Sequence, residues 1–381
     1  VFLFLNAQAM DLSTYATNPL WQVVDGPWKL SAFTVGGEAT LVPNPAYSGP
    51  VKASISKFVE VPFTTAPAEV KALRTGNSID IGYLPYADIG LKSALAGEGY
   101  SLVPWENLAI DYALYNLVNP KVGKILSQLY VRQAIQHTEN QPEMIRDILK
   151  GYGSATYGPI PLEPKSDLVS SFERTNPYPF SISDARSLLS SHGWKIHAGG
   201  ADVCEKPGSG AGECGADIAK GAQLSFQLLY ANGGEDLTRE VETIQSAASR
   251  AGIKISLTRR PFTAVSSTVG PCPASCDWQI AIYGGTSYGA LPTGDGLFLP
   301  DAALNAGSYS NPTATKDIEA MLKSNNPNAF DNYENYLAEQ LPWLWIPTLA
   351  YQLTMIKDNL KGVAPQNGYL DLTPENFSFT R

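Results

Sequence analysis

Hydrophobic positions recur along this chain with two periods, and segments of the two kinds follow each other in turn. Apolar residues three and four apart predict short amphipathic helices over residues 67–74, 183–192, 237–248, 312–322 and 329–341. Alternating or continuous apolar runs predict strands over residues 54–62, 79–84, 224–230, 253–257 and 278–283. Because strands and helices alternate instead of falling into separate blocks, the pattern predicts an α/β fold.

Residues 129–161 are the most informative stretch, because two short helices are predicted there, followed by a loop rich in Gly and Pro. The second helix begins after Asn140, whose side chain is suited to cap it, and it has Pro142 in its first turn. Gly151 is a suitable left-handed terminator. The stretch predicts a scaffold without evident chemistry of its own.

Composition fits a globular chain with an ample core, since 44% of the 381 residues are hydrophobic and 17% are charged. The length suggests two domains. A formal charge of −9 argues against a nucleic-acid partner, which needs a basic face. No apolar run approaches the ~20 residues of a membrane span, and Val1–Leu5 is too short for a signal peptide, so we expect it to be the interior of a strand.

Four cysteines form two local pairs, Cys204/Cys214 and Cys272/Cys276, each of which brackets a loop rich in Gly or Pro. Three connectivities are possible, and pairing of neighbours is expected. Free thiols or zinc ligands are the alternative, but the spacings differ from those of a zinc ribbon and no histidine lies near either pair. Disulfides are therefore favoured, and with them an exported protein.

Several motifs resemble those of a known family. The run Val131–Ile135, the later Gly151-Tyr152-Gly153 and the final Gly158–Pro161 are similar to the most recognisable segment of the family 5 extracellular solute-binding proteins. These are the peptide-, dipeptide-, nickel- and oligosaccharide-binding receptors of ABC importers. Further similar segments are Asp25–Leu30, Asn44–Tyr47 and Asp184–Trp194. Asn140 departs from the family, in which aspartate is common at that position.

The resemblance implies an α/β fold of the type II periplasmic-binding-protein kind, with two lobes that close by a hinge around a solute. It implies that residues 1–108 are the remainder of lobe I, that 109–352 are lobe II, and that 353–381 return to lobe I. The protein would be a monomeric extracellular or periplasmic receptor without enzyme activity or cofactor, which passes its solute to an ABC permease. Family members usually carry a further N-terminal portion with a lipoprotein anchor, so we expect truncation rather than a reduced variant.

The family's solute site lies between the lobes and is built from loops at strand ends. Three such loops are expected here, after the strands near residues 230, 257 and 283. Asn116 is either a hinge or ligand contact, or it caps a turn before Pro120. The rings in the set are either ligand contacts or ordinary core and surface side chains. The candidate ligand-binding residues are Asn116, Tyr230, Asn232, Arg260, Phe262, Tyr283, Thr286, Ser287 and Tyr288.

The third loop bears on the choice of solute. In dipeptide and oligopeptide receptors its equivalent carries an aspartate that holds the α-ammonium group, whereas this chain has Ser287 or Tyr288 there. The first loop shows no arginine within residues 230–234 to clamp a carboxylate. Tight dipeptide binding is therefore disfavoured, and an oligosaccharide or a longer peptide held through its backbone is expected.

Other chemistry finds little support. The three histidines, His137, His192 and His197, lack metal-site spacing, so no metal is expected. The glycine run 208–212 lacks the flanking strand and helix of a phosphate loop, and no Gly-x-Ser-x-Gly elbow follows a strand. Arg132 and Glu139 are expected to form structural ion pairs. A secreted α/β hydrolase is the rival function, and an orphan sensor domain is a third possibility.

Overall fold

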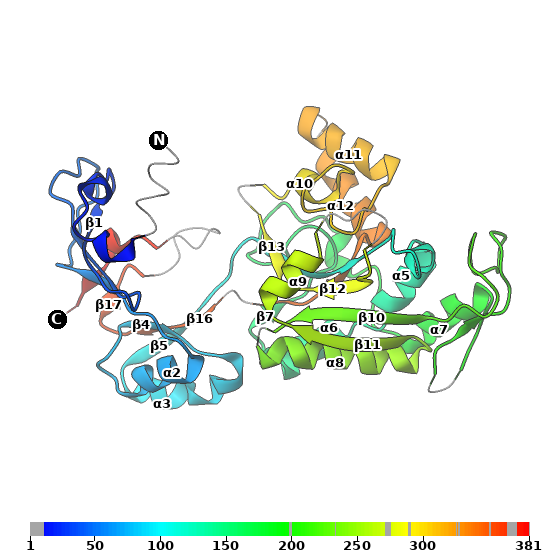
Figure 1. Ribbon diagram of the computed structural model, residues 1–381, viewed down its shortest axis with the longest axis horizontal. Coiled ribbons are helices and arrows are strands. Elements are labelled where there is room, and N and C mark those ends of the chain that lie inside the picture. The colour runs from blue at the N-terminus through cyan, green and yellow to red at the C-terminus, as the bar shows by residue number, and fades with distance from the viewer. Residues whose placement is uncertain are drawn as a thin grey trace. The chain divides into compact units, whose positions relative to one another are not determined.

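The chain forms two compact units, residues 1–106 with 351–381 and residues 107–350 (Figure 1). The computed structural model describes residues 11–197, 200–232, 234–270, 276–288, 291–324, 326, 328–349, 352–363 and 372–380. The two divisions, after residues 106 and 350, fall two residues before the predicted ones. The predicted strand Val1–Leu5 lies outside the described residues.

Unit 1 contains two small antiparallel sheets. One has the order β1-β2-β3 and the other the order β4-β16-β5, so a strand from the C-terminal segment lies between two N-terminal strands. The strands are β1 (Trp28–Phe33), β2 (Ala39–Pro43), β3 (Phe58–Glu60), β4 (Ile81–Tyr83), β5 (Tyr100–Trp105), β16 (Gln352–Lys357) and the pair β17 (Leu360–Lys361) and β18 (Ser378–Phe379). The helices are η1 (Leu12–Thr14), η2 (Pro19–Gln22), α2 (Ala66–Arg74), η3 (Tyr86–Leu91), α3 (Lys92–Gly97) and η5 (Pro374–Asn376).

Local signals explain much of unit 1. Thr65 caps α2 by accepting a hydrogen bond from the Ala68 N–H, and a proline occupies the first turn. The expected strand over residues 54–62 was wrong in extent, because only Phe58–Glu60 is a strand. β3 pairs only with residues 39–41 of β2, so the preceding residues have no ladder partner there.

Unit 2 is built around a six-stranded mixed sheet. β10 pairs in parallel with β11 and with β12, whereas β12, β13 and β14 all pair antiparallel with β6. Leu114 of β6 pairs with both Ala281 and Trp343, so β12 and β14 lie on opposite sides of β6. The strands are β6 (Ala109–Tyr115), β10 (Ser225–Ala231), β11 (Lys254–Arg260), β12 (Ile280–Ile282), β13 (Gly285–Ser287) and β14 (Trp343–Ile346).

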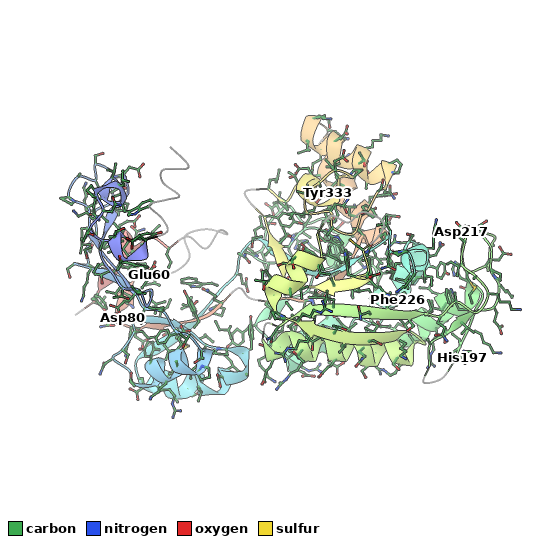
Figure 2. The ribbon with its side chains drawn as sticks, in the orientation of Figure 1. Glu60, Asp80, His197, Asp217, Phe226 and Tyr333 are labelled. Carbon is green, nitrogen blue, oxygen red and sulfur yellow. A yellow bond between two sulfur atoms is a disulfide. The ribbon has the colours of Figure 1, made fainter. Side chains whose placement is uncertain are left out.

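Helices pack on this sheet and on each other. α8 packs against β11, α9 against β10 and α5 against β14, while α5 contacts α7 and α11 contacts α12 (Figure 1). Tyr333 of α12 is fully buried in the large core cluster that includes Leu229 of β10, and Phe226 of β10 is also fully buried (Figure 2). The helices are α4 (Gly123–Leu126), α5 (Leu129–Gln136), α6 (Gln141–Asp147), η4 (Glu173–Thr175), α7 (Ile182–Ser191), α8 (Glu235–Arg250), α9 (Phe262–Thr268), α10 (Asp295–Phe298), α11 (Pro312–Lys323) and α12 (Ala329–Gln340). Among the described residues, no helix is long and apolar enough to cross a membrane.

Two of the expected helix details can be compared directly with the structure. The predicted start of α6 is confirmed: Asn140 accepts a hydrogen bond from the Glu143 N–H, and Pro142 lies in the first turn. The predicted end at Gly151 was wrong, because α6 ends at Asp147 and a turn connects it to Gly151, which has φ +84°. The prediction that Ser183 caps α7 was wrong. Ser181 is the cap, because its extended backbone lets Oγ accept from the Asp184 N–H at 3.2 Å.

Short pairs complete unit 2. β7 (Gly153–Ser154) pairs with β15 (Thr348–Leu349), and β8 (Trp194–Lys195) pairs with β9 (Val203–Cys204). The segment after β8, in which His197 and Asp217 are labelled in Figure 2, is stapled by a buried disulfide between Cys204 and Cys214. This pairing was predicted and is confirmed. Cys272 lies outside the described residues, so its pairing with Cys276 stays a prediction.

Candidate functional site

The ends of several strands of unit 2 meet along one edge of the sheet. β10, β11 and β12 run in parallel and end there at Ala231, Arg260 and Ile282. β6 runs the opposite way and therefore begins at that edge. We call it the carboxyl edge, and loops at such an edge are the usual place for ligands in α/β sheets.

Four of the candidate residues come together in two pairs at the carboxyl edge. The Asn232 N–H donates to the Arg260 carbonyl oxygen at 2.6 Å, and the neighbouring Arg259 guanidinium donates to the Asn232 side-chain oxygen. Phe262 and Tyr283 form an edge-to-face ring contact with centroids 6.2 Å apart. Phe262 is 54% exposed, which is unusual for so large an apolar ring and leaves it available to a ligand.

The expected third loop is in part a strand. Gly285–Ser287 forms β13 against β6, so Thr286 and Ser287 are held in a ladder instead of a loop. The Tyr112 hydroxyl and Thr286 Oγ1 are 2.6 Å apart, and the Asn107 amide donates to Ser287 Oγ at 2.7 Å. A loop was the wrong expectation because the strand partner lies far away in the sequence, and the glycine-rich composition hides the pairing.

Three candidates lie beneath the surface. Tyr230 is 5% exposed, and Tyr288 is buried with its hydroxyl donating to the Pro159 carbonyl oxygen at 2.7 Å. Asn116 is fully buried, its amide donates to the Trp278 carbonyl oxygen at 2.8 Å, and its side-chain oxygen accepts from the Val118 N–H. These contacts place Asn116 in the turn-capping role, the alternative to ligand contact.

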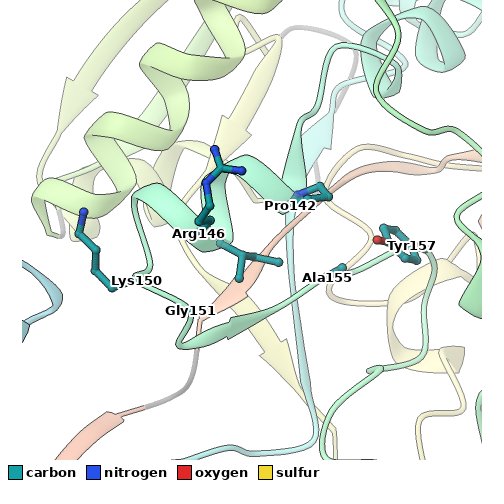
Figure 3. Close-up of a pocket in the computed structure, with 7 residues that line it drawn as sticks. Pro142, Arg146, Lys150, Gly151, Ala155 and Tyr157 are labelled. Carbon is teal, nitrogen blue, oxygen red and sulfur yellow. The ribbon is translucent and has the colours of Figure 1, made fainter.

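Beside the carboxyl edge lies a hollow of about 460 Å³ that the sequence did not indicate. Figure 3 shows its side chains, which come from α6 and from the loop that follows β7. The local signal for it is the spacing of positions 142, 145 and 146 on one face of α6. It is lined by Pro142, Ile145, Arg146, Lys150, Gly151, Ala155 and Tyr157.

Buried acids characterise the interior of unit 2. Burial raises the pKa of Asp111 to about 6, and a hydrogen bond from the Leu349 N–H opposes the rise. A Cβ at Gly285 would collide with the Asp111 carboxylate, so only glycine fits at this point of β13. Burial also raises the pKa of Glu139 and Glu240 well above the ordinary value. Burial therefore makes these carboxyl groups bind a proton at a higher pH than exposed ones do.

The expected ion pairs of Arg132 and Glu139 were wrong. The Arg132 guanidinium donates to the backbone carbonyl oxygens of Leu126 and Leu341 at 2.8 and 2.9 Å. Neither carboxyl oxygen of Glu139 has a hydrogen-bond partner among the described residues. Among these residues, no group of three or more His, Cys, Asp or Glu side chains is arranged to hold a metal ion.

Comparisons with known proteins agree on one family. The family described as bacterial extracellular solute-binding proteins, family 5 middle region, matches residues 5–298. Protein XP55 of Streptomyces lividans is 23% identical over 304 residues, which cover 79% of this chain and 50% of that protein. The oligopeptide-binding protein OppA of Lactococcus lactis subsp. cremoris strain SK11 is 24% identical over 389 residues, covering 96% and 60%. The chain thus spans about half the length of the curated relatives it matches.

A solved structure is similar throughout. The oligopeptide-binding protein AppA of Bacillus subtilis, in complex with a nonapeptide, matches with a TM-score of 0.67 and 20% identity, covering 93% of this chain and 66% of that one. Sequence identity at this level carries the fold and not the ligand, so the solute has to be argued from this chain's own residues.

Proposed function

The chain belongs to family 5 of the bacterial extracellular solute-binding proteins, and from this premise we propose that it captures a solute for an ABC permease. Its fold is α/β of the type II periplasmic-binding-protein kind, as the sequence predicted, and the likeness to AppA confirms it. Members of this family act outside the cytoplasmic membrane. A lipoprotein anchor and a monomeric state are parts of the proposal.

The observation that carries the proposal is the carboxyl edge of unit 2. Exposed groups of three kinds meet there: the Phe262 ring, the Arg260 guanidinium and the polar side chains of Asn232 and Ser287. An apolar ring with a few fixed polar groups is the usual composition of a small-molecule site. Tyr230, Tyr288 and Asn116 would support these contacts from below and would not touch the solute.

A peptide is the solute we favour. Two of the similar proteins, OppA and AppA, are named as oligopeptide-binding, and AppA holds a nonapeptide. The side-chain hydroxyls and backbone amides of β13 residues such as Thr286 and Ser287 suit contacts with the backbone of a peptide, whatever the sequence of that peptide. An oligosaccharide, which also stacks on rings and uses neutral hydrogen bonds, is the second candidate solute.

Native mass spectrometry combined with thermal shift tests the proposal. A co-purified or added oligopeptide should raise the melting temperature, since a ligand that binds only the folded state stabilises it by mass action. The same peptide, recovered after incubation, should be unchanged in mass. Hydrolysis products would favour the rival hydrolase, and the absence of stabilisation by any peptide or oligosaccharide in a broad panel would refute a receptor function.

A pair of variants locates the site. Phe262→Ala should weaken peptide binding by about tenfold, because a ring contact is worth roughly 1–1.5 kcal/mol. Phe379→Ala is the matched control, since Phe379 is 51% exposed, compared with 54% for Phe262, and lies in β18 of unit 1. Equal affinity of both variants and the wild-type protein would remove Phe262 from the site.

A further inference from the structure

The hollow beside the carboxyl edge has walls whose positions are fixed by the sequence. Pro142, Ile145 and Arg146 are spaced three and four apart on α6, so their side chains share one face of the helix. The opposite wall is an extended segment in which Ala155 and Tyr157 flank the buried Thr156. Neighbours in an extended segment point to opposite sides, so a buried Thr156 directs Ala155 and Tyr157 toward the hollow, as Figure 3 shows for Tyr157.

A polar clamp holds the two walls at a fixed distance. The Gln141 side chain accepts from the Thr156 N–H at 2.8 Å and donates to the Thr156 carbonyl oxygen at 2.7 Å. The same amide donates to the Trp345 carbonyl oxygen at 3.0 Å, and Thr156 Oγ1 contacts Thr348 Oγ1 at 2.7 Å. All these groups are buried, so the hollow is present without a ligand, and a ligand need not bear the cost of forming it.

The rim of the hollow carries two cations with different surroundings. Nε and Nη2 of Arg146 donate to the two carboxylate oxygens of Asp147 at 2.7 and 2.6 Å, so the charge of Arg146 is neutralised locally. Lys150 donates to the Asp147 carbonyl oxygen at 2.5 Å and forms no salt bridge within the described part of the chain, although its charge also acts on the carboxylates of Asp147 and Asp236. Its ammonium group therefore keeps two N–H donors and a charge to offer.

The backbone presents Lys150 in an unusual conformation. Lys150 has φ +55° and the next residue, Gly151, has φ +84°, and a left-handed conformation at a non-glycine residue is disfavoured. This double left-handed turn follows α6, and no heavy atom lies within 4 Å of the position a Cβ would take at Gly151. The turn places Lys150 among the residues that line the hollow, with its side chain directed away from Tyr157 in Figure 3.

The hollow is also tied to the carboxyl edge. Its outer wall continues into β7, which pairs with β15, and the Leu349 N–H of β15 donates to Asp111 of β6 at 3.1 Å. Lys150 is near enough to the first turn of α8 for its charge to oppose the rise that burial causes in the pKa of Asp236. The hollow is thus connected to the strands of the carboxyl edge through β7, β15 and β6.

We propose that this hollow is a subsite for an apolar side chain adjacent to a free carboxylate, which Lys150 recognises. The inference rests on the proposed function and names the chemistry of one end of the solute. Ile145, Pro142, Ala155 and Tyr157 supply apolar walls, and Lys150 supplies the positive charge beside them. Two sources carry this chemistry: the C-terminal residue of a peptide and a small carboxylic acid with an aromatic or aliphatic group.

Isothermal titration with matched acids and amides tests the assignment. The probes are the peptide Gly-Gly-Gly-Phe and the small molecule N-acetyl-phenylalanine, each as free acid and as amide. The wild-type protein should bind the acid of at least one pair about tenfold more tightly than its amide, the scale of one charge-assisted contact. Discrimination with N-acetyl-phenylalanine supports a small acid as the source, and discrimination with the peptide alone supports a peptide C-terminus.

Variants assign the effect to the named residues. Lys150→Met should reduce the acid-over-amide preference to about onefold while leaving amide binding unchanged, because it removes the charge and keeps the length of the chain. Lys121→Met is the matched control, since Lys121 is an exposed lysine that does not line the hollow. Tyr157→Ala should weaken the acid and the amide alike, and Tyr157→Phe, which keeps the ring, should bind as the wild-type protein does.

The outcomes separate the inference from the proposed function. If peptides raise the melting temperature but bind equally as acid and amide, or if Lys150→Met keeps the preference, this inference is overturned and the receptor function stands. If no peptide, sugar or acid binds at all, the receptor function fails and the inference fails with it.

Discussion

Two buried glutamates of unit 2 should make its stability depend on pH. Glu173 and Glu334 are both buried, and the Glu334 carboxylate adds to the rise that burial causes in the pKa of Glu173. Glu173 Oε1 accepts from the Ile160 N–H at 3.0 Å and so holds the Gly/Pro loop that follows residue 157. The perturbation we consider is Glu334→Gln, which keeps the shape of the side chain and removes its ionisation.

The sign follows from the direction of the pKa shifts. Burial, more than the neighbouring carboxylate, raises the pKa of Glu173 well above its ordinary value, and burial raises that of Glu334 to about 7, although the nearby Ser170 opposes the rise. A carboxyl group whose pKa is higher in the folded chain than in the unfolded chain stabilises the fold fully below the unfolded value of about 4.3. That stability is lost progressively as the pH rises from about 4.3 to the folded value, which is about 7 for Glu334.

The magnitude is a few kcal/mol. A pKa of about 7 in the folded chain against about 4.3 in the unfolded chain corresponds to about 3.5 kcal/mol, which we reduce to about 2–3 kcal/mol because a buried site relaxes when it ionises. Arg174 offsets part of the effect, and the charge of Asp331 adds to it. Glu334→Gln should therefore match the wild-type protein at pH 4 and below and exceed it by about 2–3 kcal/mol at pH 8.

Thermal unfolding at a series of pH values is the assay. For a unit of this size the expected gain at pH 8 is about 4–10 °C in Tm. Glu319→Gln is the control, because its side chain is 51% exposed and paired with Lys323 at 3.1 Å, so its difference from the wild-type protein should stay small at every pH. A Glu334→Gln difference that is the same at pH 4 and pH 8 would refute the reasoning.

Three further substitutions follow from buried contacts. Arg132→Met should lower the free energy of unfolding by about 3 kcal/mol in urea titration, because buried carbonyl oxygens lose their donor, whereas exposed Lys124→Met should change it by less than about 0.5 kcal/mol. Replacing Cys204 and Cys214 together by serine should cost about 2–3 kcal/mol without reductant, and an unchanged Tm would contradict a stabilising disulfide. Asn116→Ala should lower stability by about 1–3 kcal/mol but leave the peptide affinity of the folded protein unchanged, and an affinity loss would return Asn116 to the solute site.

Features that depend on neighbouring residues could be predicted from the sequence. Asn140 and Pro142 define the start of α6 through contacts within a few residues, and the structure has them as expected. The nearby pair Cys204 and Cys214 is of the same local kind. A local capping signal is ambiguous where two nearby residues are both suited to be the cap, as Ser181 and Ser183 are at the start of α7.

Features that depend on distant partners could not be predicted in the same way. β13 is a strand because β6, from a much earlier part of the chain, lies beside it, and no pattern within Gly285–Ser287 indicates this. Arg132 likewise finds its acceptors at the end of α12, so a charge that predicts an ion pair is satisfied by carbonyl oxygens instead. Hence the sequence indicated near which strand ends most candidate residues lie, but it did not indicate their burial or their hydrogen-bond partners.

The hollow between α6 and Tyr157 could not be predicted from the sequence, although all of its lining residues can be read there. Its walls are ordinary helix and loop residues, and what makes them a site is the Gln141 amide, which bonds both backbone groups of Thr156 across 15 residues of sequence. A buried amide with both functions satisfied fixes a distance, and a fixed distance between two apolar walls creates a hollow. The chemistry of such a site lies in one exposed lysine, but its existence depends on a buried glutamine that touches no ligand.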